Sequence, residues 1–109
     1  MEIIKMEGVG RIKFLVNEGD EQVSPFIELM SVYVEPEKRR QGHGSHLIKM
    51  LREEAKRRGV NGIYVKVTRT NLEFKNFLRK NRLVPSKRQE LFYGYSFSLL
   101  QRLRRKMKK

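Results

Sequence analysis

The sequence contains no cysteine, which excludes a disulfide framework and a metal site built on thiolates. Its two histidines, His43 and His46, cannot by themselves complete a structural zinc site. No apolar run approaches the roughly 20 residues that a membrane-spanning helix needs. The first residues, MEIIKMEGVGRIKF, lack the apolar stretch of a secretory signal. We therefore expect a cytoplasmic protein with no membrane span and no bound metal.

Acidic residues are the scarce charge, with 12 Asp and Glu against 25 Lys and Arg and a net charge of +13. Such a surface attracts polyanions, among them nucleic acid, an anionic membrane and a phosphorylated cofactor, and charge alone does not choose among them. The 109 residues, 39% of them hydrophobic, suffice for one buried core. We expect a single domain over residues 1–100 and a basic tail over residues 101–109.

Hydrophobic periodicity predicts a mixed α/β fold. The predicted strands span residues 10–16, 26–34, 63–67 and 91–99, and residues 85–89 are predicted to form a loop. One helix is expected from Gly44 or Ser45 to Arg58, with Gly59 ending it, and a second from the N-cap Asn71 to Asn81. The strand–helix–strand order around the first helix predicts a crossover between two parallel strands.

The segment RRQGHG, residues 39–44, joins a strand to the start of a helix. The N–H groups at a helix N-terminus are unpaired and carry a partial positive charge, and glycines let the backbone approach a ligand closely. Residues 39–45 therefore suit a phosphate or pyrophosphate. The same glycines would also suit a tight turn with solvated cations, and the pattern alone leaves both interpretations open. A P-loop is excluded because its Gly-Lys-Ser/Thr ending is absent.

The stretch VYVEPEKRRQGHGSHLIKMLREEAKRRG, followed by IYVKVTRTN, resembles the acyl-CoA-binding core of the GNAT family of N-acetyltransferases. That family has an Arg/Gln-x-x-Gly-x-Gly/Ala signature, which Arg39, Gly42 and Gly44 match. A Val and a Pro at the end of the preceding strand match Val34 and Pro36. The resemblance covers residues 28–83 and implies a GNAT-like fold with a truncated N-terminal part.

The resemblance also implies a function: transfer of an acetyl group from acetyl-CoA to a primary amine of a protein, peptide or small molecule, by direct attack. Loop amides would hold the CoA pyrophosphate, and the main chain of the strand would pair with the pantetheine arm. The implied cofactor-binding residues are Val32, Tyr33, Val34, Arg39, Arg40, Gln41, Gly42, His43, Gly44, Ser45 and Asn71.

Glu28 is the residue we expect to act as general base, because it lies in an apolar strand at the spacing of the histone-acetyltransferase glutamate. Phe26 and Met30 should share its strand face, with Ile27, Leu29 and Ser31 on the other. A carboxylate paired with one of the many cations is the alternative. The tyrosine that protonates the leaving thiolate in many members is replaced by Leu78, and Tyr93 is a weaker substitute.

Two further departures affect the transfer of function. The family's Gly-Phe after the second helix reads Arg82-Leu83, and a glutamate of the ribosomal-protein alanine acetyltransferases is replaced by Lys66. Two other functions therefore stay open: a nucleic-acid-binding protein that uses its basic tail, and a CoA-binding protein without catalysis. The short N-terminal part leaves room for a homodimer in which a second subunit completes the acceptor site.

Overall fold

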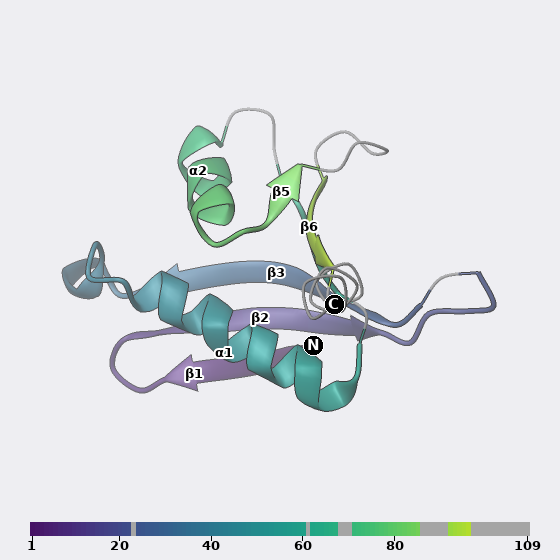
Figure 1. The fold of residues 1–109 in the computed structure, drawn as a ribbon. Coiled ribbons are helices and arrows are strands. Elements are labelled where there is room, and N and C mark those ends of the chain that lie inside the picture. The colour runs from purple at the N-terminus through teal and green to yellow at the C-terminus, as the bar shows by residue number, and fades with distance from the viewer. Residues whose placement is uncertain (23, 61, 68–70, 86–91, 97–109) are drawn as a thin grey trace, which may run out of the picture.

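The computed structural model describes residues 1–22, 24–60, 62–67, 71–85 and 92–96, and the side chains of residues 92, 93, 95 and 96 lie outside that description. A six-stranded mixed sheet runs in the order β1-β2-β3-β4-β6-β5 (Figure 1). Its strands are β1 (Glu2–Met6), β2 (Gly10–Asn17), β3 (Phe26–Val34), β4 (Gly62–Lys66), β5 (Val84–Pro85) and β6 (Phe92–Ser96). The helices are α1 (His43–Arg58), α2 (Leu72–Lys80) and a short 3-10 turn, η1 (Pro36–Lys38).

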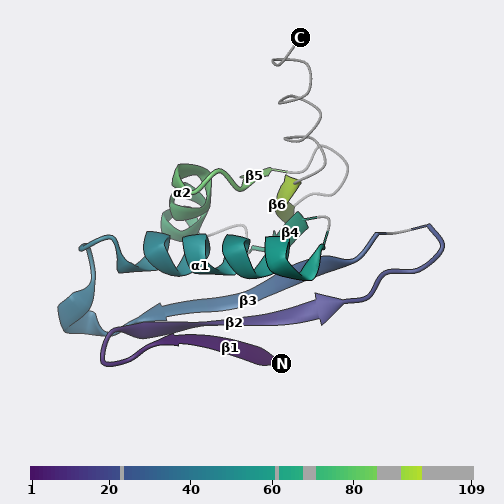
Figure 2. The same cartoon turned by 60° about the horizontal axis from the view of Figure 1, so that its bottom comes forward.

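The predicted parallel crossover is present, since β3 and β4 pair in parallel on either side of α1 in the chain. The remaining neighbours pair antiparallel. Both α-helices lie on one side of the sheet (Figure 2). The predicted mixed α/β fold is therefore confirmed.

The core fills the space between the sheet and α1. Alternate residues of β2, Ile12 and Phe14, point to the helix side and are buried. They meet one face of α1 at helical spacing: Leu47, Ile48, Leu51 and Ala55. Within the described residues, no helix covers the opposite face of β1, β2 and β3. We call this uncovered surface the bare face.

The helix boundaries follow the predicted caps closely. The side-chain oxygen of Asn71 accepts from the Phe74 N–H at 3.1 Å, so Asn71 is the N-cap of α2 as predicted. Gly59 takes a left-handed conformation and ends α1, also as predicted. The first helix begins at His43, slightly before the expected Gly44 or Ser45, because Gly42 takes the N-cap position.

Two short strands were not predicted. Glu2–Met6 forms β1, although two adjacent isoleucines hide its alternation. Pro85 was placed in a loop, which is wrong: Val84 and Pro85 form β5 against Gly94 and Tyr93 of β6. Proline is tolerated there because β5 is an edge strand. The rest of that predicted loop, the end of the last predicted strand and the tail 101–109 lie outside the described residues.

A β-bulge in β3 overturns one expectation about strand faces. Lys13 is opposite Ser31 and Phe14 is opposite Leu29, so Met30 is an extra residue without its own partner. Before the bulge, Leu29 is buried, and after it Val32 packs against the core. The prediction that Ser31 shares a face with Leu29 is therefore wrong, because the extra residue reverses the alternation.

Candidate active site

The site is built where β3 and β4 stop pairing. Only two pairs join these strands, Ile27 with Ile63 and Glu28 with Tyr64. Both strands continue, β3 to Val34 and β4 to Lys66, with no further pair between them in the described part of the chain. The parallel ladder thus ends at Glu28, and the following residues of β3 present an open edge toward β4.

Hydrogen bonding on the other side of β3 fixes which main-chain groups face this open edge. The Glu35 N–H donates to the Val9 carbonyl at 2.7 Å, so Gly10 and Val34 form a non-hydrogen-bonded pair. In an antiparallel ladder, the main-chain groups of such residues point away from the partner strand. The N–H and C=O groups of Val34, and of Val32 two residues before it, therefore point away from β2 and toward the open edge.

The loop after β3 leads to an uncapped helix start. Gly42 is the N-cap of α1 with φ of 83°. Glycine has no side-chain oxygen that could accept hydrogen bonds from the amides of the first turn. Its carbonyl accepts from the His46 N–H at 3.0 Å, while the amides of His43, Gly44 and Ser45 precede the first intrahelical bond. Arg40 also has a positive φ, 63°. Free amides and a helix dipole make this turn suitable for an anion.

The side chains of Arg39 and Gln41 stabilise the loop between β3 and α1 through hydrogen bonds to main-chain carbonyls. The Arg39 Nε donates to the Val34 carbonyl at 2.9 Å, and its guanidinium lies 5.8 Å from the Tyr33 ring centroid. The Gln41 side chain donates to the Glu37 carbonyl at 3.3 Å. One of the main-chain acceptors expected for a cofactor, the Val34 carbonyl, is thus already bonded to Arg39. The Val32 groups and the Val34 N–H remain for a ligand along β3.

The two loop glycines have different surroundings. A Cβ at Gly42 would meet no atom within 4 Å, whereas a Cβ at Gly44 would lie 3.0 Å from the Phe77 ring. Gly44 therefore allows α1 and α2 to pack closely, and Gly42 leaves open space beside the amides. Phe77 and Phe74 stack on each other with ring centroids 6.2 Å apart and pack against the core.

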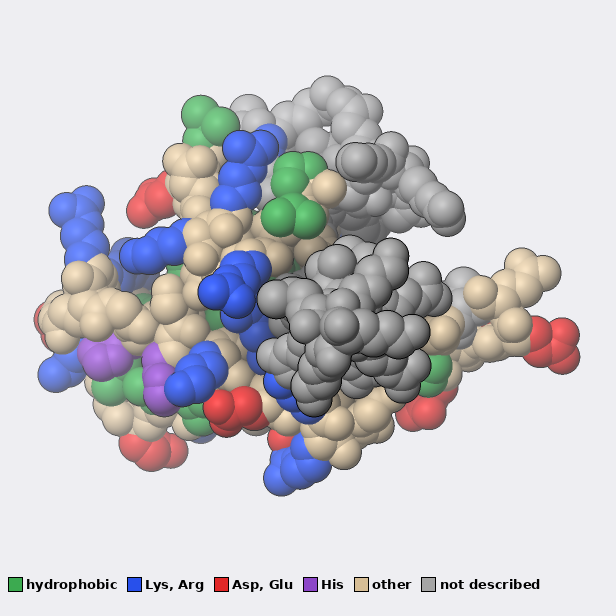
Figure 3. Space-filling model, in the orientation of Figure 1, with side chains coloured by type: hydrophobic (Ala, Val, Ile, Leu, Met, Phe, Trp, Pro, Cys, Tyr) green, Lys and Arg blue, Asp and Glu red, His purple; other side chains and the backbone are tan. Residues whose placement is uncertain are grey.

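The helix side of the molecule holds the groups suited to a phosphate-bearing ligand. Figure 3 shows this side, with histidine side chains near the start of α1 and basic side chains between α1 and α2. Asn71 lies at the N-terminus of α2 and is exposed. Its oxygen caps the helix, so its amide nitrogen is the group left to contact a ligand.

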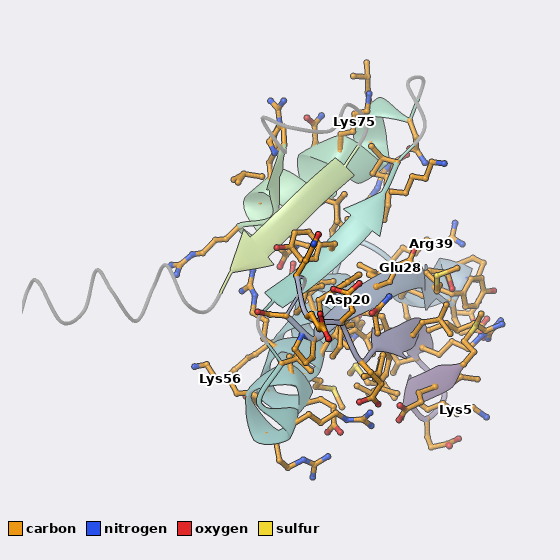
Figure 4. All side chains as sticks on the ribbon, turned by 90° about the vertical axis from the view of Figure 1, so that its right-hand side faces the viewer. Lys5, Asp20, Glu28, Arg39, Lys56 and Lys75 are labelled. Carbon is orange, nitrogen blue, oxygen red and sulfur yellow. The ribbon has the colours of Figure 1, made fainter. Side chains whose placement is uncertain are left out.

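Glu28 lies on the bare face, away from α1, at the last rung of the β3–β4 ladder (Figure 4). It is half-buried, and its cross-strand neighbours are Leu15 on β2 and Tyr64 on β4. The Tyr64 ring packs edge-on against Phe26 at 5.3 Å. The open edge of β3 begins beside this carboxylate, so groups bound on the helix side could meet Glu28 there.

Two residues that replace family side chains, Leu78 for the acid tyrosine and Lys66 for the glutamate of one branch, cannot take over their roles in the structure. Leu78 is fully buried in the core, and Lys66 is exposed at the end of β4. The backbone of Tyr93 pairs with Val65, but its side chain lies outside the described residues, so its role stays a prediction. Leu83 is fully buried and Arg82 has φ of 68°, a left-handed conformation in which the family's glycine would be unstrained.

Sequence reasoning missed Tyr64 and Arg11, which lie beside the predicted residues. Tyr64 is the cross-strand partner of Glu28, and the Arg11 guanidinium lies 4.7 Å from the Tyr33 ring. Their positions follow from strand register, which no local motif encodes. Among the described residues, no cluster of three or more His, Asp or Glu could hold a metal ion. None of the described helices is long and apolar enough to cross a membrane.

Comparisons with solved structures show the same fold in acetyltransferases. An integron cassette protein from V. cholerae has a TM-score of 0.67 at 17% identity, over 75% of this chain and 51% of its own. Arabidopsis thaliana Naa50, bound to the bisubstrate analogue CoA-Ac-MVNAL, has a TM-score of 0.65 at 20% identity, over 82% of this chain and 66% of its own. The PaiA N-acetyltransferase of Thermoplasma acidophilum, bound to coenzyme A, has a TM-score of 0.65 at 19% identity, over 82% of this chain and 54% of its own.

These identities establish a common fold and no more, and the chain spans between half and two thirds of the length of these structures. No curated protein matches the chain in sequence. The model of the acetyltransferase (GNAT) family matches residues 7–82, which is more than half of the chain and includes β3, η1, α1, β4 and α2. The chain therefore belongs to the acetyltransferase (GNAT) family.

Proposed function

We propose that this protein transfers an acetyl group from acetyl-CoA to the primary amine of an acceptor. The single observation that carries the proposal is the open edge of β3 lying between an uncapped helix start and the carboxylate of Glu28. Family membership supplies the reaction class, and the relatives bound to coenzyme A and to a CoA bisubstrate analogue support acetyl-CoA as the donor.

The residues present fit acetyl-CoA. Its pyrophosphate would accept hydrogen bonds from the amides of the first α1 turn, and the space beside Gly42 admits it. Its pantetheine arm would pair with the open main-chain groups of Val32 and Val34. Arg40, Gln41, His43 and Ser45 would surround the phosphates, with Arg39 and Tyr33 holding the loop against β3 and Asn71 reaching in from α2.

Glu28 is the proposed general base. It would accept the proton of the acceptor amine, directly or through one water, so that the neutral nitrogen attacks the thioester carbon. An open β3 N–H would donate to the thioester oxygen as charge develops on it. The carbon–sulfur bond then breaks, the attacking nitrogen loses its extra proton to water, and the thiolate takes a proton from water or from Tyr93. Leu78 cannot supply that proton because its side chain is apolar and buried.

The decisive experiment is calorimetric titration of acetyl-CoA into wild type and the Gly42→Glu variant. We expect saturable one-site binding to wild type and at least a ~100-fold loss in the variant, since a carboxylate a few ångströms from the pyrophosphate costs several kcal/mol. Gly59→Glu is a matched control at the other end of α1, because Gly59 has φ of 71° and open space around it as well. Equal affinity in all three proteins would refute the loop assignment.

A CoA-binding protein without catalysis is a second candidate, favoured by the buried Leu78 at the position of the family's acid tyrosine. Acetylation of an amine panel at saturating acetyl-CoA separates the two functions. Product formation that depends on enzyme concentration supports the transferase. Tight acetyl-CoA binding with no product above the uncatalysed rate supports the second candidate.

A further inference from the structure

Three basic side chains stand together on the bare face. Ile4 and Met6 of β1, like Ile12 of β2, pack toward the core, so the residues that alternate with them point the other way. Those residues are Lys5, Arg11 and Lys13. Lys5 is directly opposite Arg11 in the β1–β2 ladder, and Lys13 follows two residues along β2. Figure 4 shows Lys5 on the side of the sheet away from α1. We call Lys5, Arg11 and Lys13 the basic row.

The basic row has no carboxylate partner among the described residues. The ion pairs that the structure describes join Arg57 and Arg58 to Glu54 and Glu2, all on the helix side. Arg11 instead lies over the ring of Tyr33, its cross-strand neighbour. Like charges directly opposite each other destabilise a sheet. The repulsion between Lys5 and Arg11 therefore destabilises the sheet, and a bound anion would reduce this repulsion.

The basic row begins two residues along β2 from the pair that contains the proposed base. Leu15 pairs with Glu28, and Lys13 is two residues from Leu15 on the same strand face. At about 3.3 Å per residue, Lys13 is displaced from the Glu28 rung by about 7 Å along β2, and Arg11 by about 13 Å. These spacings correspond to two and four residues of an extended peptide whose amine lies at Glu28.

The bare face also carries exposed apolar side chains. Ile3 is 49% exposed and Leu15 36%, and strand register interleaves these two side chains with the basic row. The cofactor would not need this row, because the amides proposed for its pyrophosphate begin α1 on the opposite side of the sheet. Mixed apolar and basic side chains suit a peptide, which offers both kinds of group, better than a phosphate backbone, which offers only charge.

We propose that the basic row binds acidic residues of a peptide acceptor and so selects substrates with Asp or Glu two to four positions after the reactive amine. This inference rests on the proposed function for the position of the amine. The observation behind the inference is that three cations without carboxylate partners among the described residues lie on an uncovered sheet face, beginning two residues along β2 from the Glu28 pair.

The test measures peptide binding by fluorescence anisotropy, so that it does not depend on turnover. Peptides with a free N-terminal amine and either Glu or Gln at positions 3–5, otherwise identical, are titrated with wild type and with the Lys5→Gln/Lys13→Gln variant. We expect wild type to bind the Glu peptide at least fivefold more tightly, and the variant to lose about three- to tenfold of this affinity while its affinity for the Gln peptide is unchanged.

Lys49→Gln/Lys56→Gln is the matched control, because both lysines are exposed on α1 on the other side of the sheet and the pair removes two positive charges, as the test variant does. It should leave the preference for the Glu peptide within twofold of wild type. The basic tail is present in every protein compared, so it cannot produce a difference between them. Raising the salt concentration should reduce the preference in wild type, because exposed charges are screened.

Three results would overturn the inference: equal binding of Glu and Gln peptides, a preference that survives in the Lys5→Gln/Lys13→Gln variant, or an equal loss in the Lys49→Gln/Lys56→Gln control. Displacement of the Glu peptide by a short DNA duplex, with duplex binding lost in the double variant alone, would assign the row to nucleic acid instead. A parallel acetyl-CoA titration keeps the two hypotheses separate. Failure of acetyl-CoA to bind refutes the proposed function, whereas normal acetyl-CoA binding without an acidic preference refutes only the inference.

Discussion

Glu28 illustrates how a single side chain acquires a role from its surroundings. A glutamate inside an apolar strand is unusual, and here it ends a two-pair parallel ladder. It is half-buried beside Tyr64, on the face opposite the helices. The carboxylate can therefore meet an amine arriving from the bare face while the donor binds from the helix side.

Replacing Glu28 by Gln should slow acetyl transfer more at low pH than at high pH. At low pH the acceptor amine is protonated and needs a base, whereas near its own pKa it loses the proton unaided. We expect a 10²- to 10⁴-fold loss of kcat/KM at pH 7, which is the usual contribution of a general base, and a much smaller loss at pH 9.5. The measurement is a pH profile of kcat/KM with acetyl-CoA saturating.

Glu53→Gln controls for the loss of one negative charge, because Glu53 is exposed on α1 far from the ladder end. Its profile should follow that of wild type. A Glu28→Gln profile parallel to wild type at every pH would exclude proton acceptance by Glu28. It would leave the carboxylate a structural role at the end of the ladder.

At the scale of elements, local signals predicted the helices well. Asn71 and Gly59 mark helix ends through chemistry contained in a few adjacent residues, and both predictions are confirmed. By contrast, β5 has two residues and exists only because β6 pairs with it, so no local pattern could predict it. The bulge at Met30 likewise depends on the register with β2. The glycine-rich start of α1 could be predicted from the sequence, but the placement of Glu28 and this loop on two different faces of the sheet could not.

The contact between α1 and α2 gives an element-scale prediction. A methyl group at Gly44 would lie 3.0 Å from the Phe77 ring, which is held by stacking on Phe74. Gly44→Ala should therefore lower the free energy of unfolding by about 1 to 2 kcal/mol through overpacking. Urea denaturation measures this change.

Combining Phe77→Leu with Gly44→Ala tests whether the loss of stability comes from the contact with the Phe77 ring, because the smaller leucine side chain relieves the clash. The double variant should lose less stability than the sum of the two single changes, with a coupling energy of at least about 0.5 kcal/mol. Strict additivity would show that Gly44 is required for some reason other than its contact with α2.

At the scale of the whole molecule, the β3–β4 ladder joins two parts of unequal size. One part contains β1, β2, β3 and the α1 helix packed on them, and the other contains β4, β6, β5 and α2. A connection through two strand pairs leaves most of the β3 edge open to a ligand. The first part must be held rigid by other contacts for that edge to keep its shape, and long-range side-chain contacts contribute to this.

Arg58 makes such a contact at the end of α1. It pairs with Glu54 within the helix and with Glu2 of the edge strand β1. Its Nη1 donates to the Glu2 carboxylate at 2.6 Å and its Nε to the Glu54 carboxylate at 2.7 Å. Its guanidinium carbon lies 5.6 Å from the centroid of the Phe14 ring. The hydrogen bonds from Arg58, and secondarily the nearby positive charges, hold the pKa of the Glu2 and Glu54 carboxyls below the ordinary value of 4.5. The same bonds, to Glu2 first, raise the pKa of Arg58.

The sign of the pH dependence follows from these lowered pKa values. A carboxyl whose pKa is lower in the folded state stabilises the fold above its unfolded value, and this contribution is lost as pH falls through the folded value. Arg58→Gln should therefore lower the free energy of unfolding at pH 7. The difference from wild type should be smaller at pH 3, which lies below the ordinary carboxyl value of 4.5, because protonation of Glu2 and Glu54 begins to remove the contribution there. Urea denaturation at the two pH values gives the comparison.

Arg57→Gln is the control that isolates the contact across the molecule. Arg57 pairs with Glu54 within α1 but does not reach β1, and its side chain is 75% exposed. Its replacement should change stability at pH 7 by less than Arg58→Gln does, because exposed pairs within a helix contribute little. If the two variants behave alike at pH 7, the tie to Glu2 contributes nothing and β1 is held by its ladder with β2 alone. If the Arg58 effect is unchanged at pH 3, it comes from packing on Phe14 rather than from the carboxylates.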